Sequence, residues 1–509
     1  SDNYPYAIKY SINWAWSVQN PDGSVDNYSE KDILNYHRNS LNESSFKLIF
    51  SSKEEAKACV KAYKMHLMNK YYKKGIDKDK GYAEYENLYY NPQPQVSFTV
   101  MDQYTGYVKA VVGGRGKKNV SLSLNRATDS TRQPGSTFKI LSAYAPAIDT
   151  MGYTLTTTIV DEPFSYSNGR AVKNWYSGYR GTVRKAIADS MNICAVKTLT
   201  DITPQLGYDY LCNFGITTLV DNRVEKNGSV SSDIQQALAL GGITDGVTNL
   251  EMTAAYATIA NQGTYTRPVF YSQVIDSNGR VLLDNTTPTT HTVLKASTAS
   301  LLTQGMTSVI TEGTGTSAKL DGKMPVSGKT GTTSSEYDLW FCGYTPYLTA
   351  SIWTGYDENV SLSGDQAYHE RLWAKIMNQI DSVKKYKAKS FKMSKDVKKY
   401  DICSSSGKVA IKGVCPTSKS EYFAKGTQPA KCTYHSAFSK KSSSYSNSSS
   451  SSGSYSSSGS SSSSNSGNSK SGSNSSKSSS SRTDSGSSRT SKSSSGSSSS
   501  KGSGKTAGK

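Results

Sequence analysis

The chain has 509 residues, enough for more than one domain, and a formal net charge of +19 at pH 7. A basic chain attracts polyanions, but no nucleic-acid-binding motif accompanies this charge, so cell-wall or lipid anions are the better candidates. No apolar run of about 18 residues exists and the first residues do not form a signal peptide, so no membrane span is predicted.

The first part of the chain, residues 1–93, mixes aromatic and charged residues. Ser52 and Glu55 form a capping box at the start of a helical stretch, and Gly75 marks the end of that stretch. We therefore interpret residues 1–93 as a mostly helical linker or connector module.

The pattern changes at residue 94, where strands and helices alternate in blocks. A hairpin is predicted from two alternating segments joined by a turn, and helices and further strands follow. The predicted strands are 95–101, 107–112, 324–333, 339–344 and 348–356, and the predicted helices are 135–150, 183–201, 249–262 and 296–312. This order predicts an α/β fold of the α+β type, in which helices flank one antiparallel sheet.

Ser136 is predicted to lie in the first turn of a helix, after the turn signal Pro134-Gly135. Lys139 follows three residues later, so both side chains share one helical face. A serine hydroxyl needs a base to become a nucleophile, and a lysine can serve only if burial or a nearby cation lowers its pKa. The alternative is a helix cap followed by a surface lysine, because a Ser-x-x-Lys spacing is common.

Ser190 and Asn192 belong to a Ser-Met-Asn tripeptide that follows a helical run. A second hydroxyl could relay a proton from Lys139 to a leaving amine, and the Asn192 amide could orient the substrate or Lys139. The tripeptide alone carries little information, so an ordinary loop is the alternative.

Residues 327–333 read Ser-Gly-Lys-Thr-Gly-Thr-Thr in a predicted strand. Lys329 supplies a cation, Thr330 and Thr332 supply hydroxyls for a carboxylate, and Gly331 lets another backbone approach closely. Alternation places the two threonines on one face and the lysine on the other, so the strand must border the cleft edge-on or be strongly twisted. A phosphate-binding loop is excluded because the required earlier glycine is missing.

A small segment, residues 391–435, follows the last strands and contains Cys403, Cys415 and Cys432. No Cys-x-x-Cys pair or Cys/His cluster is found, so neither a metal nor a cofactor is predicted. A disulfide between Cys403 and Cys415 is an alternative to free thiols, depending on the redox compartment.

The last part, residues 436–509, consists mostly of Ser with Gly, Asn and Lys, and it holds +9 of the net charge. Such a composition cannot bury enough apolar surface to offset the entropy lost on ordering. The prediction is a disordered basic tail that could adsorb to anionic cell-wall polymers.

Taken in order, the three polar segments and their flanks resemble the transpeptidase domain of class A (bifunctional) penicillin-binding proteins, relatives of the serine β-lactamases. The resemblance covers about residues 94–435. The matching flanks are Leu124–Thr128, Arg132–Lys139, Asn174-Trp175, Ala239–Gly242, Gly246–Met252, Asp338–Phe341 and Trp353–Asp357.

The resemblance implies the chemistry of the site. Ser136 would attack the bond between the two terminal D-alanines of a peptidoglycan stem peptide, with Lys139 as the base. Ser190 would pass a proton to the departing D-alanine, and Asn192 would orient the bound peptide.

Lys329 with Thr330, Gly331 and Thr332 would bind the substrate carboxylate, and backbone N–H groups of Ser136 and Thr332 would form the oxyanion hole. A neighbouring stem-peptide amine would then accept the acyl group, whereas a β-lactam would leave Ser136 blocked.

The resemblance also implies a domain plan and a location. We expect a connector in residues 1–93, a transpeptidase domain in 94–390, a small segment in 391–435 and the tail in 436–509. No glycosyltransferase signature is present, so we expect a piece of a longer protein that is anchored through an upstream segment. The expected location is the extracytoplasmic face of a bacterial membrane or wall, of Gram-positive type.

Two alternatives remain at this point. Water could accept the acyl group, as in a D,D-carboxypeptidase or β-lactamase, although none of Glu225, Glu251 and Glu312 lies in a matching motif. The chain could also be a β-lactam sensor module, which would be acylated without transferring the acyl group to an amine.

Overall fold

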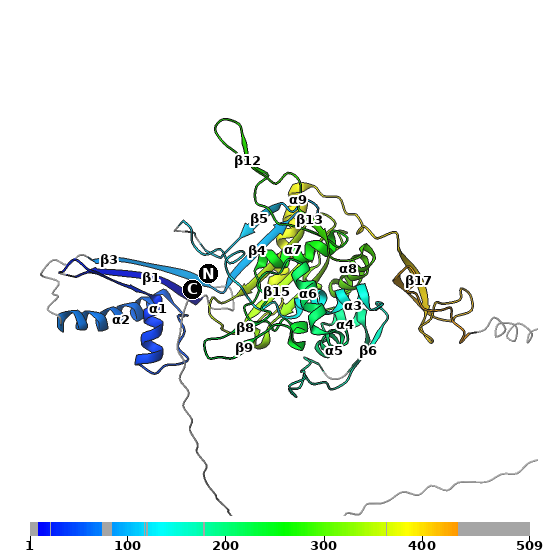
Figure 1. Ribbon diagram of the computed structural model, residues 1–509, viewed down its shortest axis with the longest axis horizontal. Helices are drawn as coiled ribbons and strands as arrows, with labels where there is room; N and C mark the ends of the chain where they lie inside the picture. Colours follow the sequence, from blue (N-terminus) through cyan, green and yellow to red (C-terminus); the bar gives the residue numbers. More distant parts are fainter. Residues whose placement is uncertain are drawn as a thin grey trace, which may run out of the picture. The chain divides into compact units, whose positions relative to one another are not determined.

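The computed structural model describes residues 9–435 except 21, 74–83, 117, 119–120, 177–178 and 363 (Figure 1). The predicted tail and the predicted helix stop at Gly75 lie outside the described residues. Among the helices of the described part, none has the length and apolar character that crossing a membrane requires.

The first part of the chain is built on a three-stranded antiparallel sheet with the order β2-β1-β3. The sequence prediction of a mostly helical module missed this sheet, whereas the predicted helix is present as α2, where the Glu55 amide donates to Ser52 Oγ at 3.0 Å. The elements are β1 (Lys9–Gln19), β2 (Val25–Ser29), α1 (Glu30–Asn35), α2 (Lys53–Lys73) and β3 (Glu84–Gln93).

The pattern that was missed lies in β1. Ile12, Trp14, Trp16 and Val18 occupy every second position and are all buried, which is the signature of a strand with one covered face. They form one core with residues of α2 such as Val60. The aromatic content of this region thus reflects a sheet face packed on a helix.

The central part of the chain contains a five-stranded antiparallel sheet with the order β14-β15-β16-β4-β5 (Figure 1). Its strands are β4 (Gln95–Met101), β5 (Val108–Val112), β14 (Ser327–Thr332), β15 (Asp338–Tyr344) and β16 (Thr349–Gly355). The predicted strands are all present, so the antiparallel sheet is confirmed. The chain's early hairpin pairs with its late strands, which leaves β14 at one edge.

The helices of this part are α3 (Ala145–Thr150), α4 (Val183–Ala188), α5 (Asn192–Ile202), α6 (Pro204–Asn213), α7 (Asn249–Ala260), α8 (Ala296–Thr311) and α9 (Tyr368–Lys384). Short hairpins lie between and after them. Their strands are β6 (Thr158–Asp161), β7 (Tyr179–Thr182), β8 (Arg223–Val224), β9 (Val230–Ser231), β10 (Thr264–Thr266), β11 (Gln273–Ile275), β12 (Val281–Asp284), β13 (Thr290–Thr292), β17 (Val397–Cys403) and β18 (Ser418–Ala424).

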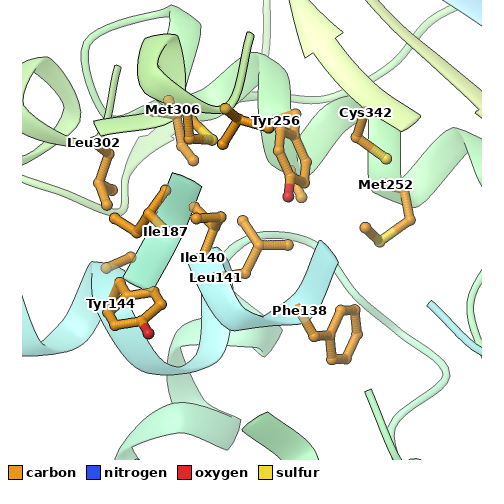
Figure 2. Close-up of a cluster of buried hydrophobic side chains, with 14 of the residues drawn as sticks. Phe138, Ile140, Leu141, Tyr144, Ile187, Met252, Tyr256, Leu302, Met306 and Cys342 are labelled. Carbon is orange, nitrogen blue, oxygen red and sulfur yellow. The ribbon is translucent and has the colours of Figure 1, made fainter. Parts of the chain in front are cut away.

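Helices cover both faces of the central sheet. Trp373 of α9 packs edge-on against Phe341 of β15, while Tyr256 of α7 lies near the next residue of that strand, Cys342 (Figure 2). Successive side chains of a strand point to opposite faces, so α9 and α7 lie on opposite sides of the sheet. The fold class is therefore the predicted one.

The core also holds the segment that follows Ser136. Phe138, Ile140, Leu141 and Tyr144 have no exposed surface and belong to the hydrophobic cluster of which Figure 2 shows a part. Burying a side chain of this size contributes about 1.5–3 kcal/mol relative to leaving it exposed. The residue that we expect to react is thus attached to a rigid part of the domain.

Candidate active site

Ser136 lies in a 3-10 turn, Gly135–Thr137, which leads into a helical segment and then α3, as the sequence predicts. Gly135 has φ +54°, and a Cβ atom there would lie 2.8 Å from the carbonyl oxygen of Thr332. Only glycine tolerates both conditions, so this residue lets the turn approach β14 closely. The Thr137 carbonyl accepts a 2.8 Å hydrogen bond from Tyr256.

The Ser136 side chain is half-buried and borders a cleft of about 550 Å³. The cleft is lined by residues of the Ser136 turn, the end of β14, a glycine-rich turn and the start of α5. They are Thr131, Arg132, Gln133, Gly135, Ser136, Tyr166, Arg170, Asn192, Ala237, Leu240, Gly241, Gly242, Asp245, Thr332, Thr333, Ser334, Tyr337, Asp338 and Asn359. Three of the predicted residues, Ser136, Asn192 and Thr332, therefore open onto one cavity.

Lys139 lies beneath this cleft with no exposed surface. Its Nζ atom contacts the Ser190 carbonyl oxygen at 2.6 Å, Ser190 Oγ at 3.1 Å and Asn192 Oδ1 at 2.6 Å. Burial, and secondly the charge of Lys329, hold the pKa of Lys139 well below its usual value. The structure therefore brings the first two predicted segments together around one lysine nitrogen.

Ser190 adopts φ +55°, a conformation that a non-glycine residue rarely takes. It lies between α4 and α5, so the predicted helix over 183–201 is broken at this point. The reason is that the backbone must turn to aim both the carbonyl and the hydroxyl of Ser190 at Lys139. Such local strain is typical of functional sites and is held in place by the surrounding packing.

Asn192, the first residue of α5, is fixed from both ends of its amide. Its Nδ2 atom donates to the Lys173 carbonyl at 2.7 Å, while its Oδ1 atom accepts from Lys139. The neighbouring Asn174 accepts from the Ile193 amide and donates to Asp161. These contacts hold the start of α5 in place beside the cleft.

The third segment forms β14, whose outer edge faces the Ser136 turn because the strand ends the sheet. The expected edge-on placement is therefore observed. A Cβ atom on Gly331 would lie 2.6 Å from the Pro134 carbonyl oxygen, which confirms the predicted close approach of another backbone. Thr332 is exposed in the cleft, whereas Thr330 is buried and hydrogen-bonds Thr314 at 2.7 Å.

Lys329 is fully buried, and its Nζ atom donates to the Thr330 carbonyl oxygen at 3.0 Å. Burial lowers the pKa of Lys329 to about 7, while the charge of Glu370 acts in the opposite direction. Glu370 of α9 is itself 4% exposed, and burial raises its pKa to about 7. Its Oε2 atom has no hydrogen-bond partner among the described residues.

Glu370 is a member of the site that the sequence did not indicate. It comes from a helix that starts well after the third segment, and no motif surrounds it. The available signal was that Glu370, next to His369, lies on the buried face of α9, where the remaining buried residues are apolar, such as Trp373 and Met377. A buried acid near a buried lysine stabilises the charged form of that lysine.

The side chains around the cleft provide a nucleophile together with a base. A hydroxyl opens onto a cleft, and a lysine with a lowered pKa lies directly beneath, in contact with a second hydroxyl and an amide. In the described part of the chain, no hydrogen bond joins Ser136 Oγ to Lys139 Nζ, and catalytic hydrogen bonds often tighten only when the substrate binds. This set of groups supports acyl transfer through a serine ester.

Comparison with known proteins gives two family matches. The profile described as "Penicillin binding protein transpeptidase domain" matches residues 96–380, and the one described as "Penicillin-binding protein 1A, C-terminal domain" matches residues 393–437. Penicillin-binding protein 1A of Clostridium tetani is 33% identical over 363 residues, which cover 67% of this chain and 45% of that relative. The chain thus spans about half the length of this curated relative.

Two solved structures share the fold. Penicillin-binding protein 1A from Haemophilus influenzae has a TM-score of 0.55 and 24% identity, and the match covers 67% of this chain and 55% of the other. The PonA1 protein from Mycobacterium tuberculosis, solved in complex with penicillin V, has a TM-score of 0.50 and 23% identity, with 59% and 80% covered. At these identities the likeness shows the fold.

Proposed function

The chain belongs to the family of penicillin-binding protein transpeptidase domains, and we propose that it is a serine D,D-transpeptidase that cross-links peptidoglycan stem peptides and is inactivated by β-lactams. One observation carries this proposal above all. The buried Lys139, with its lowered pKa, contacts Ser190 and Asn192 directly beneath the cleft into which Ser136 opens.

The first half-reaction forms an ester on Ser136. Its Oγ attacks the carbonyl carbon of the penultimate D-alanine, and its proton passes to the neutral amine of Lys139. Ser190, at 3.1 Å from that amine, relays a proton to the nitrogen of the departing D-alanine. The C–N bond breaks, a C–O bond forms, and the proton count is unchanged.

The free edge of β14 suits a substrate of this kind. An extended peptide can pair with an unpaired strand edge through its backbone, and the side chains of the strand then determine specificity. We assign the carboxylate of the terminal D-alanine to Thr332 at the cleft, with the charge of Lys329 and the hydroxyl of Thr330 behind it. Backbone N–H groups of Ser136 and Thr332 are assigned to the oxyanion.

The acceptor is an amine rather than water, and the carboxylates near the site support this choice. Among the described residues that line the cleft, none is a glutamate, and Glu370 neighbours the buried Lys329 without lining the cleft. Glu251 caps α7 through Thr248, and Glu225 pairs with Arg223, so both are engaged elsewhere. The cleft aspartates are also paired, Asp245 with Arg223 and Asp338 with Arg132.

The experiment that tests this function supplies a stem-peptide donor ending in D-Ala-D-Ala together with an amine acceptor. Wild-type protein should release D-alanine and form the cross-linked peptide, and a bound penicillin should persist for minutes to hours. Release of D-alanine without cross-links would indicate a D,D-carboxypeptidase. Loss of the penicillin adduct within milliseconds would indicate a β-lactamase. A stable adduct with neither product would indicate a sensor module.

The proposed substrate determines the proposed location. Peptidoglycan stem peptides lie outside the bacterial cytoplasmic membrane, so we place this domain on the extracytoplasmic side, and the Clostridium relative favours a Gram-positive wall. We further propose that the basic residues of 436–509 bind anionic wall polymers. Removing these residues should weaken salt-sensitive adsorption to isolated wall, and unchanged adsorption would rule the binding out.

A further inference from the structure

Four side chains from three places in the sequence meet near the loop that joins β17 to β18. They are Cys403, Cys415, Cys432 and His435, and their sulfur and nitrogen atoms all lie within 4.8 Å of one another. Cys403 and Cys432 are almost fully buried, with 0% and 2% of their surface exposed. All seven cysteines of the chain are free, so the disulfide considered for Cys403 and Cys415 is absent.

The separations of His435 from two of the sulfur atoms match those of a tetrahedral zinc site. The Nδ1 atom of His435 lies 3.5 Å from Cys403 Sγ and 3.7 Å from Cys432 Sγ. With Zn–S bonds of about 2.3 Å and a Zn–N bond of about 2.0 Å, tetrahedral geometry places neighbouring ligand atoms roughly 3.5–3.8 Å apart. The side chains are therefore already spaced for one ion.

Hydrogen bonds to the sulfur atoms give a second, independent indication. The amides of Ser405 and Ser406 donate to Cys403, and the Ile411 amide donates to Cys415 Sγ at 3.2 Å. Thiolates, which are the form that binds zinc, gain from such donors.

The same arrangement surrounds Cys432. The amides of Tyr434 and His435 donate to its sulfur, and Ser406 Oγ donates to it at 3.2 Å. Contacts of this kind fix the ligands of a metal site from outside.

The hairpin also has only a small core of its own. Among the described residues from Val397 to His435, the buried apolar side chains apart from the cysteines are Ile402 and Phe423. Segments this small usually need a disulfide or a structural metal to fold. A metal held by ligands from the end of β17, the connecting loop and the last turn would close the whole segment.

We propose that Cys403, Cys415, Cys432 and His435 bind one structural Zn²⁺ ion in the C-terminal segment. All four positions are taken by protein atoms, so the ion would have no open position for chemistry. This revises the prediction of no metal, which rested on a search for Cys-x-x-Cys pairs. The missed signal is the Cys-x-x-His spacing of Cys432 and His435.

The segment that the ion would order is tied to the active site. Glu421 of β18 forms a two-pronged ion pair with Arg184 at the start of α4, with both N···O distances at 2.6 Å. Arg184 also donates to the Gln304 carbonyl and to Ser308 of α8. Because α4 leads directly to Ser190, the zinc site would support the helix that positions this residue.

The test uses the full chain, purified under reducing conditions with zinc and then desalted. Metal analysis should find one zinc per chain, and cobalt substitution should give the visible absorption of tetrahedral thiolate coordination. Cys432→Ser and His435→Ala should lose zinc. Ser406→Ala, which removes only a donor to Cys432, should weaken zinc binding by roughly 10–100-fold.

A matched control lies elsewhere in the chain. Cys59 Sγ lies 3.7 Å from His37 Nε2, so Cys59→Ser removes a cysteine that also neighbours a histidine, and zinc content should not change. Chelation should also speed tryptic cleavage after Lys408 and Lys419 in wild type. The proposal would be overturned if reduced wild-type protein contained no zinc, or if Cys432→Ser bound as much zinc as wild type. A disulfide mapped between two of the three cysteines in the native protein would also overturn it.

Discussion

The close approach at Gly331 makes a quantitative prediction. A methyl group there would lie 2.6 Å from the Pro134 carbonyl oxygen, about 0.8 Å inside the 3.4 Å at which ordinary contact begins. That oxygen belongs to the backbone of the turn that carries Ser136, so relief requires the turn or β14 to move. Overpacking of this kind costs about 1–3 kcal/mol, and a misplacement near 1 Å can cost about 100-fold in rate.

We therefore expect Gly331→Ala to react with penicillin about 100-fold more slowly and to melt a few degrees lower, at about 2–4 °C per kcal/mol. Time courses of labelling with a fluorescent penicillin measure the rate. Gly322→Ala is the matched control, because a Cβ atom there meets nothing within 4 Å, and it should label as wild type does. A wild-type rate for Gly331→Ala would refute the claim that this contact positions Ser136.

The other predictions concern the buried charges. Lys139→Arg should lower penicillin acylation by about 10²–10⁴-fold, because a guanidinium cannot act as a base, and a rate within tenfold of wild type would exclude that role. Lys329, with its pKa lowered to about 7, loses its proton as the pH rises through that value, so acylation should decline on the basic side. Glu370→Gln removes a charge that raises the pKa of Lys329, so the decline in acylation should begin at lower pH. The pH profile of penicillin labelling measures this, and an unchanged profile would contradict the influence of Glu370 on Lys329.

Local patterns made most of the central sheet predictable. The alternating segment at Gln95–Met101 and the strands around Asp338–Tyr344 and Thr349–Gly355 are continuous apolar or alternating runs bounded by turns. Their period, rather than any distant contact, determines the type of element. The alternation along β1 is equally local, since Ile12, Trp14, Trp16 and Val18 take every second position, although the predictions for residues 1–93 rested on the capping box at Ser52 and Glu55.

The meeting of the three polar segments could be predicted only as an order along the chain. Nothing local indicates that Ser190 breaks a helix, because residues 183–201 keep an apolar period on both sides of it. Its left-handed backbone accompanies a contact with Lys139, which belongs to another helical segment and is far away in the sequence.

Glu370 acquires its chemistry from Lys329, a neighbour that only the folded chain supplies. The Cys-x-x-His spacing of Cys432 and His435 is local, but only the fold brings this pair to Cys403 and Cys415.

The most direct test of the account is peptide mapping of the penicillin adduct. Intact-protein and peptide mass spectrometry of the wild-type chain should find one adduct, on the peptide that contains Ser136, and Ser136→Ala should carry none while melting within a degree or so of wild type. An adduct that forms equally well on Ser136→Ala, or that maps to another peptide, would contradict the central claim that this hydroxyl is the nucleophile.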